Sequence, residues 1–173
     1  MNFYLLIFCV LLWNNVQAEI EIIFDDAECK YSNDEFVEPG SCEITVDDDS
    51  EYGSTVSTHL EVIKQPPEDI RAIAKVYGVN MGEYTNDIGL DVDTNFCEVT
   101  KEHHSIARPF ISAFGLNDLA CPIPPGVYGM EHYVIDNNDG LPESFPIGRY
   151  LISISLLNDE YTIITVDIYL TIT

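Results

Sequence analysis

The alternation of apolar and polar residues near the C-terminal end constrains the fold of this chain more than any other feature. From Thr162 to Ile172 the even-numbered positions are Thr, Ile, Val, Ile, Leu and Ile, and the odd-numbered positions are mostly polar. The stretch Tyr150–Leu156 alternates in the same way, and the polar residues 158–160 separate the two stretches. Because successive side chains of a strand point to opposite faces, this pattern predicts a β-hairpin with one buried face.

Shorter stretches upstream show the same period of two. They are Ile20–Phe24, Cys42–Val46, Val56–Val62 and Ile70–Tyr77. The second of these is expected to stop at the acidic run Asp47–Asp49, which is interpreted as a solvated turn. Clusters of Gly, Pro, Asn and Asp separate the stretches at spacings of roughly 8–15 residues, which is typical of short antiparallel strands. The sequence therefore predicts an all-β protein built as a two-sheet antiparallel β-sandwich.

One segment has a helical period instead. Ile106, Phe110 and Phe114 are spaced at i, i+4 and i+8, so they form an apolar stripe on one face of a helix. Pro109 is tolerated only in the first turn, so the helix is expected to begin near it and to be about two turns long. Gly115 is placed where a C-terminal cap is expected.

The N-terminal residues predict export. The apolar run Phe3–Trp13 is shorter than the roughly 20 residues that a membrane helix needs, and Val16 and Ala18 are small residues at the −3 and −1 positions of a cleavage site. We therefore expect a signal peptide at residues 1–18 and one domain at residues 19–173, secreted and extracellular. No later stretch reaches about 18 uncharged apolar residues, so no membrane span is expected.

Cysteine usage agrees with an oxidising compartment. Cys9 leaves with the signal peptide, and Cys29, Cys42, Cys97 and Cys121 remain. Four such cysteines predict two disulfides, each worth roughly 3 kcal/mol. Three pairings are possible, and proximity along the chain favours Cys29–Cys42 and Cys97–Cys121, with the predicted helix inside the second loop. No metal site is expected, because the cysteines and histidines lack CxxC and HxxxH spacings.

Charge and motif content narrow the function classes. The formal net charge is −23, from 7 basic and 30 acidic residues, which disfavours nucleic acid and anionic membranes as partners and favours a basic one. The hydrophobic fraction of 46% is high enough for a folded core. There is no G-x-S-x-G motif, and no histidine has a recognised spacing to a nucleophile, so we expect no enzymatic activity and no cofactor.

The last third of the chain carries a more specific pattern: Cys-Pro-Ile, then Gly-x-Tyr, then Leu-Pro followed by Pro-x-Gly-x-Tyr. The residues concerned are Cys121, Pro122, Ile123, Gly126, Tyr128, Leu141, Pro142, Pro146, Gly148 and Tyr150. With this pattern the chain resembles insect secreted proteins related to the ML lipid-recognition family, of the ganglioside-activator and CheA/CheB chemosensory type. Over the first two-thirds of the chain the resemblance rests on strand rhythm and cysteine placement.

The resemblance implies an immunoglobulin-like sandwich that opens at one side into an apolar cup for a lipid or a similar hydrophobic molecule. It also implies a carrier or accessory role, chemosensory and extracellular. Two features depart from the family pattern. Ganglioside activators carry more disulfides, and a net charge of −23 disfavours acidic head groups. Prolines 122, 124 and 125 fit a stiff lip beside the cup, because they fix φ and cannot join a central ladder.

Alternation and resemblance together assign the ligand-binding residues. The cup is expected to be lined by Ile152, Ile154, Ile164, Val166 and Ile168, with Tyr128, Ile106, Phe110 and Phe114 near its mouth. In the alternative, the two sheets close on each other as an ordinary core. The chain is then a protein-interaction module whose acidic surface binds a basic extracellular protein or receptor. The sequence alone leaves both alternatives open.

Overall fold

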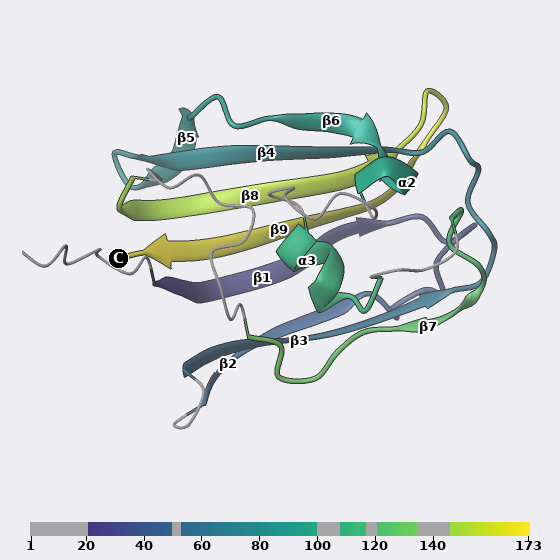
Figure 1. Cartoon of the computed structure of the whole chain (residues 1–173), viewed down its shortest axis with the longest axis horizontal. Helices are drawn as coiled ribbons and strands as arrows, with labels where there is room; N and C mark the ends of the chain where they lie inside the picture. The colour runs from purple at the N-terminus through teal and green to yellow at the C-terminus, as the bar shows by residue number, and fades with distance from the viewer. Residues whose placement is uncertain (1–20, 50–52, 100–107, 117–120, 135–145) are drawn as a thin grey trace, which may run out of the picture.

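The described residues of this computed structural model, 21–49, 53–99, 108–116, 121–134 and 146–173, form two antiparallel sheets packed as the layers of a sandwich (Figure 1). This confirms the predicted all-β, two-sheet architecture. The expected signal peptide lies outside the described residues.

The larger sheet has six strands in the order β1-β9-β8-β4-β5, with β6 also paired to β4. Their bounds are β1 Ile22–Ser32, β4 Arg71–Asn80, β5 Glu83–Asp87, β6 Val92–Asn95, β8 Gly148–Leu157 and β9 Thr162–Ile172. Strand β9 pairs with β1 on one side and with β8 on the other, so the predicted C-terminal hairpin lies within the sheet. Its alternation is confirmed, since the even-numbered residues from Ile164 to Ile172 are all buried.

The smaller sheet has three strands, β2 (Glu43–Asp49), β3 (Gly53–Val62) and β7 (Gly126–Tyr128). The prediction that β2 stops at the acidic run was wrong. Asp47 and Asp48 pair with residues 55 and 54 of β3, and their side chains are exposed, so a strand accommodates them without burying charge. Among the described strands, the short edge strand β7 pairs with the end of β3 alone, as expected for a chain leaving a run of prolines.

Two short helices, α2 (Phe96–Val99) and α3 (Arg108–Ala113), precede β7. Helix α3 confirms the predicted short helix. It ends as expected at Gly115, whose φ of 66° suits glycine. The N–H of Gly115 donates to the carbonyl of Ser112 (2.8 Å), and the N–H of Leu116 donates to that of Ile111 (3.1 Å), which is a Schellman cap. No helix in the described part of the chain is long and apolar enough to cross a membrane.

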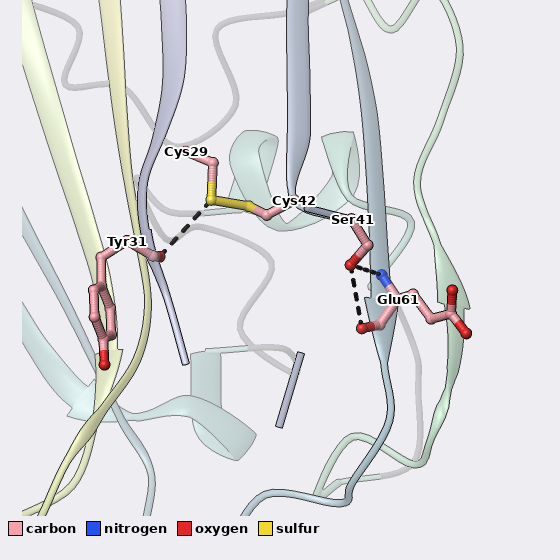
Figure 2. Close-up of a disulfide and its surroundings, with 5 residues drawn as sticks. All are labelled: Cys29, Tyr31, Ser41, Cys42 and Glu61. Carbon is pink, nitrogen blue, oxygen red and sulfur yellow. Dashed lines mark hydrogen bonds between the residues drawn. A yellow bond between two sulfur atoms is a disulfide. The ribbon is translucent and has the colours of Figure 1, made fainter. Parts of the chain in front are cut away.

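A disulfide ties the two sheets together (Figure 2). Cys29 belongs to β1 of the larger sheet, and its partner Cys42 directly precedes β2 of the smaller one. Next to it, the hydroxyl of Ser41 accepts a hydrogen bond from the N–H of Glu61 (3.1 Å) and lies 3.5 Å from that residue's carbonyl oxygen, to which it donates. The chain that crosses between the layers is therefore held to both of them.

The same local bend leads into β7 and β8. In the first bend the hydroxyl of Tyr128 donates to the carbonyl of Pro124 (2.7 Å), and in the second that of Tyr150 donates to the carbonyl of Pro146 (2.8 Å). A Cβ atom on the central glycine of the motif would lie 3.4 Å from the tyrosine oxygen in the first bend and 3.3 Å in the second. The repeated Pro-x-Gly-x-Tyr sequence therefore forms a corner in which the tyrosine packs over the glycine.

We expect Tyr150→Phe to lower the free energy of unfolding by about 1 kcal/mol, because the buried ring stays and its hydrogen bond to Pro146 is lost. Urea denaturation measures this change. Tyr31→Phe is the matched control at an exposed position, where the expected change is within about 0.5 kcal/mol. Equal effects of the two substitutions would show that the corner bond does not stabilise the fold.

One carboxylate is buried on the opposite, outer face of β9. Asp167 is only 1% exposed, and it accepts hydrogen bonds from the hydroxyl of Ser153 in β8 (2.5 Å) and from Nζ of Lys30 in β1 (2.7 Å). A buried charge needs such partners. The hydrogen bond from Lys30 to Asp167, and then the charge of this carboxylate, raise the pKa of Lys30 above its ordinary value of 10.5.

This shift predicts an alkaline dependence of stability. The raised pKa means that folding favours the ammonium form of Lys30. Its contribution is therefore fully present below pH 10.5 and is lost as the pH rises through the folded-state pKa. The Lys30→Met variant lacks this stabilising contribution at every pH. The difference in unfolding free energy between the two proteins should then shrink above pH 10.5 in urea titrations, and a constant difference would contradict the assignment.

Candidate functional site

The two sheets differ in size, and this difference creates the candidate site. Three strands cannot cover the whole inner face of a six-stranded sheet. Helix α3 lies between the two layers in Figure 1 and contributes to the cover. Ile111, Phe114 and Leu116, in or just after α3, belong to the buried core.

An apolar pocket of about 50 Å³ remains between these elements. Its lining consists of Leu60 from β3, Phe96 from α2, Ile111, Phe114 and Leu116 from the α3 segment, Ile154 and Leu156 from β8, and Ile164 and Val166 from β9. The β8 and β9 residues are cross-strand partners next to the hairpin turn, so the pocket lies at that end of the sandwich. Since each of these described side chains is apolar, the space suits hydrocarbon better than water.

Four of the residues expected to bind ligand line this pocket: Phe114, Ile154, Ile164 and Val166. Ile152 and Ile168 are buried and pair with each other one step further along the hairpin, outside the pocket lining.

Of the three remaining predicted residues, the structure describes the side chain of Tyr128 alone. Tyr128 is half-buried at the edge of the core and is tied to its own loop by the corner bond. Ile106 lies outside the described residues, and for Phe110 the structure describes only its backbone within α3.

Five lining residues were not in the predicted set: Leu60, Phe96, Ile111, Leu116 and Leu156. Leu156 shares the inward face of β8 with Ile154, and Leu60 follows the alternation of β3, so periodicity could have found both. Ile111 precedes Phe114 by three positions, which is also a helical neighbour. Phe96 had no local signal, because α2 is a single turn and its position depends on the sheet beside it.

The second disulfide holds the segment that contains α3. It joins Cys97 in α2 to Cys121, which precedes β7. With Cys29–Cys42 it completes the pairing that proximity favours. Because Phe96, the neighbour of Cys97, lines the pocket, both ends of this segment are anchored close to it.

A buried hydroxyl fixes the end of α3 to the smaller sheet. Oγ1 of Thr58 in β3 donates to the carbonyl of Ala113 (2.5 Å) and accepts from the N–H of Met130 (3.2 Å). Residues 129 and 130 can lie this close to Thr58 because residue 129 is a glycine: a Cβ atom at Gly129 would lie 2.1 Å from the carbonyl oxygen of Thr58. Helix α3 is therefore held over the pocket by a directed hydrogen bond as well as by apolar packing.

The side chains that the structure describes around the pocket offer apolar burial, and none of them can transfer a proton or act as a nucleophile. Among the residues that the structure describes, no group of three or more His, Cys, Asp or Glu side chains is arranged to hold a metal ion.

Comparisons with known proteins match a family model and solved structures. The model of a protein family of unknown function (DUF1091) matches residues 81–152, less than half of the chain. Among solved structures, the protein is similar to chicken MD-1 complexed with lipid IVa. The two share 15% sequence identity with a TM-score of 0.34, and the match covers 88% of this chain and 90% of the MD-1 chain. No curated protein matches the sequence significantly.

Thr58→Val tests the attachment of α3. The substitution keeps the shape of the side chain but leaves the carbonyl of Ala113 and the N–H of Met130 without this partner. We expect it to lower the free energy of unfolding by about 1–3 kcal/mol and to speed amide hydrogen exchange in α3. Thr45→Val, at an exposed position of β2, is the control. Unchanged exchange in α3 would show that packing alone holds the helix.

Proposed function

We propose that this protein is a secreted, non-enzymatic carrier that binds a lipid or a lipid-like hydrophobic small molecule between its two sheets. The observation that carries the proposal is the pocket itself, whose described lining side chains are all apolar and which is bounded by both sheets and α3. Binding would be reversible and driven by apolar burial, at about 25 cal/mol per Å² less the ordering terms.

The size of the pocket defines how a ligand must enter. A volume of about 50 Å³ is well below the roughly 300–1,000 Å³ of ordinary small-molecule sites. A ligand therefore has to displace side chains, and Ile111, Phe114 and Leu116 are the candidates, because they belong to one short segment outside both sheets. Moving this segment enlarges the pocket without breaking a sheet ladder, although it breaks the Thr58 hydrogen bond.

This mechanism favours a ligand with one narrow hydrocarbon chain. Such a chain can follow the inward faces of β8 and β9 from Ile154 and Val166 toward the next cross-strand pair, Ile152 and Ile168. That path keeps all five predicted strand residues in the proposed site. Tyr128, Ile106 and Phe110 remain proposed for its mouth.

Secretion and a chemosensory role belong to the same proposal. Two disulfides within so small a protein suit an oxidising compartment. The N-terminal apolar run with its cleavage pattern supports export. The chemosensory role rests on the sequence resemblance carried by the two proline-punctuated motifs before β7 and β8.

A second candidate function is an extracellular interaction module that binds a basic partner or receptor. One observation favours it: with only about 50 Å³ between its layers, the unliganded sandwich is close to a filled core. The net charge of −23 then supplies the recognition, and binding should weaken steeply with salt.

Native mass spectrometry of the secreted chain, followed by organic extraction, separates the two functions. A stoichiometric lipid or hydrocarbon supports the carrier and identifies its ligand class. A chain that emerges empty and takes up no member of a panel of single-chain lipids contradicts the carrier and favours the interaction module.

Ile154→Ala should weaken retention of the extracted ligand, because it removes apolar contact from the pocket lining. Ile172→Ala is the matched control: its side chain is on the same inner face of the sheet and is buried, but it lies at the other end of β9, outside the pocket lining and the proposed path. Both substitutions should lower stability by about 2–5 kcal/mol, so comparing them separates binding from folding. Equal retention in two folded variants would count against the proposed lining.

A further inference from the structure

The outer face of the larger sheet, which faces away from the smaller sheet, carries a second hollow. This groove has a volume of about 450 Å³, within the roughly 300–1,000 Å³ typical of ligand sites. Four strands line it: β1 with Asp25, Asp26 and Glu28, β5 with Tyr84, β8 with Arg149 and β9 with Tyr169. Its lining is thus polar and aromatic, in contrast to the interior pocket.

The register of β1 explains why acidic side chains gather there. Ala27 pairs with Ile168, and both are buried on the inner face, so the flanking Asp26 and Glu28 point outward. The pairing with β9 is irregular between residues 24 and 26, which inserts Asp25 as an extra residue and brings a third carboxylate to the groove.

An aromatic contact forms another side of the groove. The rings of Tyr84 and Tyr169 meet edge to face, with centroids 5.2 Å apart, although β4 and β8 separate their strands in the sheet. The hydroxyl of Tyr169 donates to Glu28 (3.2 Å). Burial, and then the charge of Glu28, raise the pKa of Tyr169, so this hydroxyl stays protonated and keeps donating at neutral pH.

The charge in the groove is negative. Among the described residues that line it, Arg149 is the one cation. It lies 3.8 Å from Asp25, which also accepts a hydrogen bond from Thr171 (2.8 Å). Lys30, nearby on β1, is engaged by Asp167. In the described lining, three carboxylates thus face one cationic side chain, on a protein whose net charge already attracts cations.

We propose that this groove binds a basic, extended peptide segment of a partner protein, with two Lys or Arg side chains at positions i and i+2. Asp26 and Glu28 are two residues apart on one face of β1, about 7 Å, which matches the i, i+2 spacing of an extended peptide. The rings of Tyr84 and Tyr169 add cation–π contacts. The proposal deepens the second candidate function and does not depend on lipid binding.

Calorimetric titration of the full chain with two isomeric peptides tests the proposal. The probe is the acetylated, amidated peptide Thr-Arg-Thr-Arg-Thr, and its isomer is Thr-Thr-Arg-Arg-Thr, whose adjacent arginines point to opposite sides. We expect the probe to bind more tightly and its affinity to fall as salt rises. Absence of binding by either peptide, or equal binding of both, overturns the proposal. Lipid extraction is a separate measurement, so failure here is distinguishable from failure of the carrier function.

Substitutions in and outside the groove test where the probe peptide binds. The double substitution Asp26→Asn with Glu28→Gln should weaken binding of the probe peptide about fivefold or more. Arg149→Gln should strengthen its binding about two- to fivefold, because it removes a like charge. Glu43→Gln with Asp47→Asn removes the same charge from exposed positions of β2 and should have little effect. Equal weakening by the two double variants indicates a diffuse acidic field. Weakening by Arg149→Gln shows that the bound peptide does not meet Arg149 as a like charge. Either result overturns the assignment.

Discussion

Burial of the inner face of β9 is the constraint on which the rest of the structure depends. This strand lies inside the larger sheet, paired on both sides, and its even-numbered aliphatic side chains must be covered. The smaller sheet has too few strands to cover all of that face, so the α3 segment supplies Ile111, Phe114 and Leu116. The interior pocket lies where these two kinds of cover meet the β8–β9 hairpin.

The same period of two gives the larger sheet two chemically different faces. Inward residues of β8 and β9 enclose hydrocarbon-like space, whereas outward residues of β1 and β9 carry carboxylates and tyrosines. Asp167 belongs to the outer, polar face but is itself buried, and its carboxylate accepts hydrogen bonds from Lys30 and Ser153. The proposed lipid site and the proposed basic-peptide groove therefore lie on opposite sides of one sheet.

The local sequence pattern predicted the elements that are long enough to show a period or that end at a clear cap residue. The C-terminal hairpin, the short helix ending at Gly115 and the sandwich architecture could all be read from periodicity and cap residues. Strands β5, β6 and β7 were missed because three to five residues are too few to show a period. Strand β2 was cut short at Asp47 because a charged run resembles a turn, although an exposed strand tolerates it.

The sequence by itself determined which side chains of each long strand share a face, because alternation is a property of a single strand. It also determined the two proline-glycine-tyrosine corners, whose hydrogen bonds span only four residues. Only the tertiary structure decided that Phe96 and Leu60 meet Ile164 around a pocket of about 50 Å³, and that Tyr84 meets Tyr169 across an outer groove. These contacts join residues far apart in the chain, so they depend on how the sheets and helices pack.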